Sequence, residues 1–258
     1  MEKLTAVIGD VHGCTQELKK LISTLLNKGV GKFVFAGDLL DRGPDSVGAV
    51  RVVRKLAETK EVVLVKGNHE EKHERFRKHI KDGARREYSM AGYKELFNIT
   101  SNLEEEDISF LDTAVLYHQM HFGNHDILVV HAGIPPIIKR LLTIDELNSL
   151  SSKMKKYFNQ VLRVRYVNPK GYMVMLGAEK PEDVYWAEIY DGRFGHVYFG
   201  HQPFSEETAK KFPHATGIDL GCVFGDKMCA AVFNSLTGEN VEFVYENALQ
   251  KYAKRLGE

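Results

Sequence analysis

The chain has 258 residues, and its 35 Lys and Arg residues balance its 35 Asp and Glu residues, so the formal net charge is zero. A balanced charge gives no sign of a polyanion partner such as a nucleic acid duplex, although it leaves room for a local basic pocket. The three cysteines form no CxxC pair and argue against a disulfide framework, which favours a reducing cytoplasm as the location. Neither a signal-peptide pattern nor an apolar run of membrane-spanning length is present, so we expect no membrane association.

The first part of the chain alternates predicted strands with predicted helices. Apolar runs at 4–10, 32–38 and 61–68 predict buried strands. Each run precedes a segment with helical spacing or helical composition, at 14–28, at 46–57 and after residue 68. Such alternation is typical of βαβ units and predicts a largely parallel sheet.

A charged stretch follows the third predicted strand. Residues 76–99 contain no Pro and have a helical composition. A shorter helix is expected after Asn102, which is positioned to cap it. We therefore predict a helical wall or lid at about residues 76–112.

The second part of the chain predicts more strands around a mixed middle segment. Residues 143–164 favour helix, beginning at a capping box of Thr143 and Glu146, and an Asn-Pro turn signal predicts a hairpin at 165–176. Further strands are expected at 114–122, 126–134, 196–203, 227–234 and 241–246. Because no repeat, low-complexity tract or linker interrupts the chain, we predict one α/β domain over residues 1–258, with helices enclosing two sheets.

Five of the predicted strands end in polar residues beside glycine. These residues are Asp10 and His12, Asp38 with Asp41 and Arg42 just beyond it, Asn68 and His69, His131, and His201. Ligands of open α/β sheets bind beyond the carboxyl ends of strands, and glycine lets the backbone turn sharply there. One such motif alone could be a polar turn, a core histidine or a surface ion pair. Their recurrence at five strand ends favours a shared site.

The residue types at these strand ends predict a metal centre. Asp, His and Asn without Cys suit Mn²⁺, Fe or Zn²⁺ rather than a thiolate zinc site. Six ligands are more than one ion with an open position would need, so we expect two divalent ions that share a carboxylate. Two adjacent ions can activate a water and neutralise a phosphoryl group under attack.

The same motifs resemble the signature blocks of a known enzyme family. In order, "GDVHG", "GDLLDRG", "GNHE", "HAG" and "GH" resemble those of the phosphoprotein-phosphatase branch of calcineurin-like metallophosphoesterases. The segments "LRVRYVNP", "YWAEIYDGRFGHVYFGHQP" and "GIDLGCVFGDKMCAAVF" are most similar to bacterial-type members, which include symmetrical diadenosine tetraphosphatases. The resemblance covers nearly the whole chain and implies a β-sandwich flanked by helices, with a dinuclear site at the strand ends.

The resemblance also implies a role for each motif residue. The first ion would be held by Asp10, His12 and Asp38, and the second by Asp38, Asn68, His131 and His201. His69 would be the general acid that protonates the leaving oxygen. Asp41 would orient that acid, and Arg42 would clamp the phosphate.

Other site residues are less clearly marked by the motifs. A second phosphate-binding arginine is expected, with Arg165 the first choice and Arg163 and Arg193 behind it. The family often has Thr after the Gly-His pair, where this chain has Gln202. Lys72 and Arg75, three apart on one helix face, resemble residues that hold distal phosphates, and a solvated charged face is the alternative. Asp219 matches a late family block near the site, or is a turn residue.

The resemblance implies a hydrolase that cleaves diadenosine tetraphosphate symmetrically into two ADP. A Ser/Thr phosphoprotein phosphatase of broad specificity is the alternative. A non-catalytic metal-binding scaffold is more remote, because no catalytic group is missing. We expect two Mn²⁺ ions, with Fe or Zn as alternatives, and the sequence does not indicate an oligomeric state.

Overall fold

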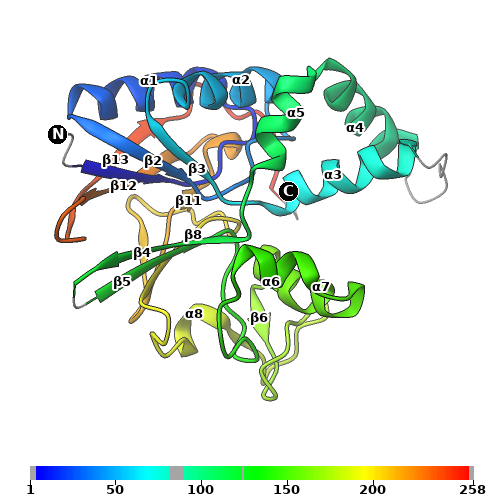
Figure 1. Ribbon diagram of the computed structural model, residues 1–258, viewed down its shortest axis with the longest axis vertical. Coiled ribbons are helices and arrows are strands. Elements are labelled where there is room, and N and C mark those ends of the chain that lie inside the picture. Colours follow the sequence, from blue (N-terminus) through cyan, green and yellow to red (C-terminus); the bar gives the residue numbers. More distant parts are fainter. Residues whose placement is uncertain (1–3, 82–89, 124, 256–258) are drawn as a thin grey trace.

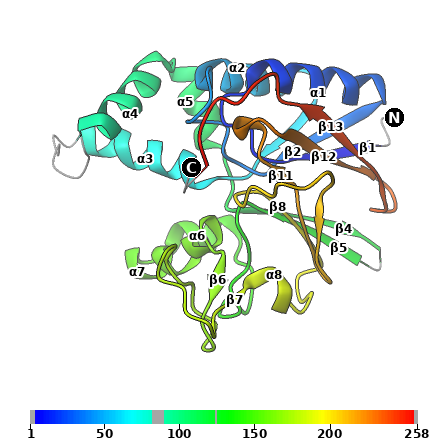
Figure 2. The same ribbon diagram turned by 180° about the vertical axis from the view of Figure 1, so that it is seen from behind.

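The computed structural model describes residues 4–81, 90–123 and 125–255. Two β-sheets pack face to face, and helices cover their outer faces (Figures 1 and 2). The first sheet has the order β11-β12-β1-β2-β3, with β13 also paired to β12. Its strands are β1 (Leu4–Ile8), β2 (Val30–Phe35), β3 (Glu61–Leu64), β11 (Asp219–Leu220), β12 (Lys227–Asn234) and β13 (Asn240–Asn247).

The second sheet has the order β4-β5-β8-β10-β9. Its strands are β4 (Tyr117–Phe122), β5 (His125–Val130), β8 (His196–Phe199), β9 (Lys210–Lys211) and β10 (Ala215–Gly217). A separate two-stranded ribbon pairs β6 (Tyr166–Val167) with β7 (Val184–Tyr185). The predicted α/β fold with two sheets flanked by helices is therefore confirmed.

The helices lie on both sides of this sandwich (Figure 1). They are α1 (Thr15–Asn27), α2 (Ser46–Leu56), α3 (Asn68–Lys81), α4 (Met90–Asn102), α5 (Glu105–Asp112), α6 (Ile144–Ser149), α7 (Ser152–Phe158) and α8 (Trp186–Ile189), with 3₁₀ turns at Asn159–Leu162 and Cys222–Phe224. The predicted wall at 76–112 corresponds to the C-terminal part of α3 with α4 and α5, and residues 82–89 lie outside the described residues. None of the described helices has the length and apolar run needed to cross a membrane.

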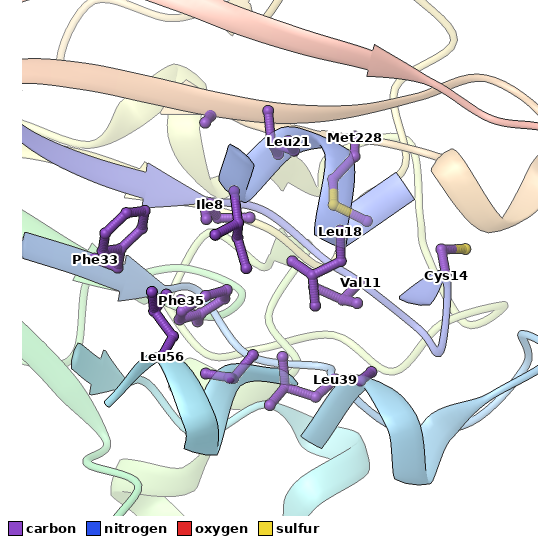
Figure 3. Close-up of a cluster of buried hydrophobic side chains, with 14 of the residues drawn as sticks. Ile8, Val11, Cys14, Leu18, Leu21, Phe33, Phe35, Leu39, Leu56 and Met228 are labelled. Atoms are coloured by element: carbon purple, nitrogen blue, oxygen red, sulfur yellow. The ribbon is translucent and has the colours of Figure 1, made fainter. Parts of the chain in front are cut away.

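Parallel pairing places the polar strand ends together. β1, β2 and β3 run parallel to one another, and β5 runs parallel to β8 in the other sheet. Their carboxyl ends therefore meet at one edge of each sheet. One core lies between the sheets and includes Val34, Val129 and Phe233. A second packs the first sheet against α1 and α2, where Ile8 faces Leu18 (Figure 3).

Local capping interactions explain why some helix boundaries in the structure differ from the predicted ones. The predicted cap Asn102 is the last residue of α4, and α5 is instead capped by a box of Glu104 and Asp107. The capping box of Thr143 with Glu146 is confirmed at the start of α6. That helix stops at Leu150, which is extended, so the predicted helical segment is broken into α6, α7 and a 3₁₀ turn.

Candidate active site

The residues predicted at the strand ends converge at one place, and their backbone is strained there. Within the described ranges, the non-glycine residues with positive φ are His12, Asp38, Asp41, Arg42 and His201, with φ between 46° and 69°. Each of them was singled out from the sequence. L-residues avoid this region, and such strain clusters at functional sites where the surrounding structure imposes it.

Asp38 lies at the centre of the cluster. Its Oδ2 is 3.3 Å from Nε2 of His131, 3.6 Å from Nε2 of His12 and 3.8 Å from Nε2 of His69. Its Oδ1 accepts a hydrogen bond from the backbone N–H of His69, at the start of α3, at 3.0 Å. The two oxygens therefore have separate roles, and Oδ2 faces the shared centre.

Backbone carbonyls orient two of these imidazoles. Nδ1 of His12 donates to the carbonyl of Leu40 at 2.9 Å, and Nδ1 of His131 donates to the carbonyl of Ala36 at 2.8 Å. In the neutral rings this leaves the Nε2 lone pairs directed at the carboxylates. A second hydrogen bond of this kind commonly fixes the tautomer of a metal-binding histidine.

His201, Asp10 and Asn68 complete the cluster. The backbone N–H of His201 donates to Asp10 Oδ1 at 3.0 Å. Oδ1 of Asn68 lies 3.0 Å from Nε2 of His131. Nε2 of His201 is buried and has no hydrogen-bond partner among the described residues. An orphaned buried nitrogen is costly unless something binds it.

This donor set fits two divalent metal ions. His12, Asp38 and His69 offer ligand atoms within 4.8 Å of one another, and so do Asp38, His131 and His201. Burial alone would lower the pKa of His131, but the carboxylates of Asp38 and Asp10 raise it to about 9, so the cluster favours a positive charge. Nitrogen and oxygen donors around a shared carboxylate suit Mn²⁺, Fe or Zn²⁺.

Asp41 connects the cluster to α3. Its Oδ2 is 2.5 Å from Nδ1 of His69 and accepts from Nζ of Lys72 at 3.1 Å. Its Oδ1 is 2.8 Å from Nε2 of His73. Burial would raise the pKa of Asp41, but hydrogen bonds from His69 and His73 hold it well below its usual range. Asp41 is therefore a carboxylate in contact with His69.

The sequence did not single out His73 or Glu70 for these contacts. The Glu70 carboxylate is buried and accepts from the backbone N–H groups of Asp38, Leu39 and Gly67 at 2.8–2.9 Å. It thereby fixes the loop after β2 to the start of α3. Both residues look like ordinary members of a charged helix in the sequence, because their partners Leu39 and Asp41 lie about thirty positions away in the chain.

Two of the candidate arginines lie beside the cluster. Arg42 is exposed, and its guanidinium lies 5.4 Å from the ring centroid of Phe224. Arg165 donates to Oε1 of Gln202 at 2.7 Å and to the carbonyl of His201 at 3.0 Å. Arg165 is therefore adjacent to a candidate metal ligand, where a second phosphate-binding arginine is expected.

The other two candidate arginines have different partners. Arg163 donates to Glu71 of α3 at 2.7 Å. Arg193 contacts both carboxylate oxygens of Asp191 and the carbonyls of Pro136 and Ile138. These contacts engage both arginines in the architecture around the site.

Lys72 and Arg75, the two predicted ligands of distal phosphates, lie three residues apart on α3 and have different contacts. Nζ of Lys72 lies 3.1 Å from Oδ2 of Asp41, whereas Arg75 approaches Glu71 at 4.0 Å. Arg75 lines a groove of about 630 Å³ between α3 and the α6–α7 pair, with Lys78, Lys155, Ile144, Leu147 and Phe158.

Asp219 lies close to the candidate ligands. It is buried, and its Oδ1 accepts from the backbone N–H of Gly221 at 2.9 Å. Burial raises the pKa of Asp219 to about 6, and Asp38 adds to this rise. Asp219 in turn contributes to the raised pKa of Asp10, after burial itself. The late sequence block is thus adjacent to the metal cluster as well as part of a turn.

The chain is similar to known proteins over nearly its whole length. The family model of calcineurin-like phosphoesterases matches residues 4–228. A bis(5'-nucleosyl)-tetraphosphatase PrpE [asymmetrical] of Oceanobacillus iheyensis is 32% identical over 244 residues, covering 88% of this chain and 87% of that protein. The protein of the same name from Bacillus subtilis strain 168 is 32% identical over 234 residues, covering 86% and 87%.

Solved structures agree on the fold. A crystal structure of a candidate diadenosine tetraphosphatase has a TM-score of 0.66 at 22% identity and covers 96% of this chain and 95% of its own. A protein serine/threonine phosphatase from Saccharomyces cerevisiae has a TM-score of 0.54 at 14% identity, covering 98% and 81%. With the family match, these findings confirm the resemblance that the sequence motifs carry. The chain belongs to the calcineurin-like phosphoesterase family and is a metal-dependent phosphoesterase.

Proposed function

We propose that this phosphoesterase hydrolyses dinucleoside tetraphosphates at a site with two divalent metal ions. The observation that carries the chemistry is that Asp38 belongs to both groups of candidate ligand atoms. We assign His69 of the first group to proton transfer, and Asp10, whose Oδ2 lies 3.8 Å from Nε2 of His12, to the metal in its place. The substrate class is supported by relatives at 32% identity that are named bis(5'-nucleosyl)-tetraphosphatases. The proposed ligands are Asp10, His12, Asp38, Asn68, His131 and His201.

The chain's own residues divide the remaining work. Metal ions bound to these ligands would supply an activated water and would withdraw charge from the phosphoryl group. Arg42, which has no ion pair among the described residues, binds the phosphoryl oxygens together with Arg165. His69 gives a proton from Nε2 to the leaving oxygen. Its Nδ1 contact with Asp41 orients the ring.

The groove beside α3 is the proposed place for the distal part of the substrate. It begins one turn after Asn68 and follows α3 to Lys78. Arg75 is half exposed there, and Lys155 has no ion pair within the described part of the chain. The lining also includes Glu71, Glu74 and Asp112, and apolar side chains from α6 and α7, Ile144 and Leu147 among them. That combination suits a polyphosphate that ends in a nucleoside.

The bond that is cleaved decides the products. The motif resemblance predicts symmetrical cleavage to two ADP, whereas the relatives at 32% identity are named asymmetrical. Asymmetrical hydrolysis of diadenosine tetraphosphate gives ATP and AMP. We favour the asymmetrical products, because the similarity to these relatives covers more than four fifths of both chains.

The test is chromatography of nucleotide products from Mn²⁺-loaded protein, beside phosphate release from a phosphoserine peptide. ATP and AMP in equal amounts, with a higher kcat/KM than for the peptide, are expected. ADP alone would restore the symmetrical prediction while keeping the substrate class. A better rate on the peptide would overturn the substrate proposal in favour of a phosphoprotein phosphatase.

A further inference from the structure

The Asp41 carboxylate contacts Lys72 and His73 in addition to His69, the proposed general acid. Its Oδ2 contacts both His69 and Lys72, while the side chain of His73 is the one that Oδ1 contacts within the described part of the chain. We propose that His73 is a positioning residue for the general acid: it holds Oδ1 of Asp41 so that Oδ2 stays directed at His69. This inference rests on the proposed role of His69.

The position of His73 suits this role. His69 and His73 are four residues apart on α3, so they lie on the same helix face. The His73 side chain is fully buried, with a relative exposure of 0%. A buried polar ring is retained at low cost only when its hydrogen bonds are satisfied. Here the Asp41 carboxylate satisfies one nitrogen and Thr100 the other.

Thr100 fixes how the His73 ring is used. Because a carboxylate can only accept, Nε2 of His73 carries the proton toward Oδ1 of Asp41. Nδ1 lies 3.0 Å from Oγ1 of Thr100, whose hydroxyl can donate to it. Since Thr100 belongs to α4, a continuous line of contacts connects the helical wall to His69.

The Asp41 carboxylate needs the contact with His73 because two side chains compete for its Oδ2 atom. Nζ of Lys72 and Nδ1 of His69 both contact that oxygen, at 3.1 Å and 2.5 Å. Without a donor on Oδ1, the carboxylate could rotate and share both oxygens with the longer, more mobile Lys72. His69 would then lose the partner that orients its ring.

A buried histidine with two partners could also serve the packing of α3 against α4 and nothing more. The two roles differ in how they depend on the leaving group. Weakening the acid slows esters whose leaving group needs a proton, and spares those that leave as stable anions. Loosening the fold or the metal site slows both kinds of ester alike.

The experiment compares phenyl phosphate with p-nitrophenyl phosphate on Mn²⁺-loaded variants. His73→Leu removes the donor, whereas His73→Gln keeps an N–H that can reach Asp41. Phe76→Leu is the matched control, because Phe76 is buried on the next turn of α3 and packs against Tyr93. His69→Asn is the reference for loss of the acid itself, and bound Mn²⁺ is measured for every variant.

We expect His73→Leu to lower kcat for phenyl phosphate about tenfold or more beyond its effect on p-nitrophenyl phosphate, as small misplacements of reacting groups do. His73→Gln should restore most of the wild-type ratio of the phenyl phosphate rate to the p-nitrophenyl phosphate rate. Thr100→Val should change that ratio in the same direction as His73→Leu, but by less. Phe76→Leu should lower the melting temperature and leave the ratio of the two rates at the wild-type value.

The positioning role would be overturned if His73→Leu lost equally on both substrates while His69→Asn lost more on phenyl phosphate than on p-nitrophenyl phosphate. The acid assignment would then still stand. If His69→Asn itself lost equally on both substrates, the assignment of His69 as the general acid would be overturned, and this inference with it. If His73→Leu does not fold, His73→Gln and Thr100→Val decide. The proposal is contradicted if Thr100→Val keeps the wild-type ratio of the two rates and His73→Gln slows both esters alike.

Discussion

Single residues in this site use their two polar atoms for different tasks. Asp38 gives one oxygen to the α3 backbone and directs the other at three imidazoles. His12 and His131 each donate a hydrogen bond from Nδ1 to a backbone carbonyl, which directs Nε2 toward the ligand cluster. A change that keeps the size of such a side chain therefore still removes one specific contact.

Asp38→Asn should be the most damaging change among the proposed ligands. It replaces a shared carboxylate by a neutral amide, and both ions would lose a ligand. We expect the variant to retain no more than about half of the Mn²⁺ bound by the wild type, and to hydrolyse p-nitrophenyl phosphate far more slowly. Elemental analysis after dialysis measures the metal, and Asp126→Asn on the β4–β5 hairpin is the control. Wild-type metal content and rate in Asp38→Asn would refute the shared-carboxylate site.

The neighbours Asn68 and His69 should separate by phenotype. His69→Asn should keep near-wild-type Mn²⁺ and lose about 10²–10⁴-fold in turnover on poor leaving groups, the usual contribution of a general acid. Asn68→Ala should instead lower the metal content. Elemental analysis and steady-state kinetics on both variants make the comparison. The division of labour fails if His69→Asn loses as much metal as Asn68→Ala.

Local signals made the candidate ligands predictable. Asp10, Asp38 and His131 each follow an apolar run and stand beside glycine or small residues, so the sequence marks them without knowledge of the fold. Glu70 and His73 carry no such mark, because their role depends on a carboxylate or loop from another strand. The contact of Lys72 with Asp41 is equally invisible in the sequence, since the two residues are thirty-one positions apart. The roles assigned to all these residues remain predictions.

On the scale of elements, α3 has three working surfaces. Its first turn presents Asn68 and His69 to the ligand cluster. The face with His73 meets Asp41 and α4, and the flank with Arg75 meets the groove. One amphipathic helix thus joins the proposed chemistry to the proposed binding of the distal nucleotide.

Arg75→Ala tests the groove. Loss of one charge-assisted contact to a phosphate costs about 1.5 kcal/mol or more, and kcat/KM for diadenosine tetraphosphate should fall about tenfold. The fall for p-nitrophenyl phosphate should be smaller, because that ester has no distal phosphates. Lys81→Ala, an exposed change at the end of the same helix, is the control. Equal effects of Arg75→Ala on the two substrates would place the distal phosphates elsewhere.

Glu70→Gln tests the join between α3 and the loop after β2. The Gln side chain has one acceptor oxygen for three N–H groups and turns an NH₂ toward them. Leaving buried donors unsatisfied should lower the free energy of unfolding by about 1–3 kcal/mol. Urea denaturation in the presence of a chelator measures this without a contribution from metal. A change as small as that of the exposed Glu58→Gln would contradict the structural role.

Element boundaries were less predictable than element types. Asn102 is a good capping residue by composition, but α4 includes it and Glu104 takes the cap with Asp107. The break at Leu150 has no strong sequence signal, since neither Gly nor Pro stands there, and Ser151 begins a new helix with its own cap. Tertiary packing decides such cases, because several residues can cap or end a helix at similar cost.

The whole molecule places the proposed ligands on both sheets. Asp10, His12, Asp38 and Asn68 follow strands of the first sheet, whereas His131 and His201 follow β5 and β8 of the second. Metal ions held by all six would therefore connect the two halves of the sandwich. Binding should be visible as a change in the stability of the entire fold.

Mn²⁺ should raise the melting temperature, and a chelator should lower it. A ligand present at about 100 times its dissociation constant adds about 2.7 kcal/mol to stability. Mg²⁺ should stabilise less than Mn²⁺, because it prefers oxygen-rich sites that keep several waters. Differential scanning calorimetry of the wild type and of Asp38→Asn provides the measurement and its control. An equal Mn²⁺ response in the two proteins would show that the stabilising ion binds elsewhere.

The five positive-φ residues have a consequence for how such a protein evolves. At about 1–3 kcal/mol each, their strain together is comparable to the net stability of a typical domain, about 5–15 kcal/mol. Arg42 is the bulkiest of the five, and glycine would adopt its backbone conformation without strain. Selection for thermal stability alone would therefore favour lineages that relax this loop and lose the guanidinium, so continued selection for turnover is what keeps the loop strained.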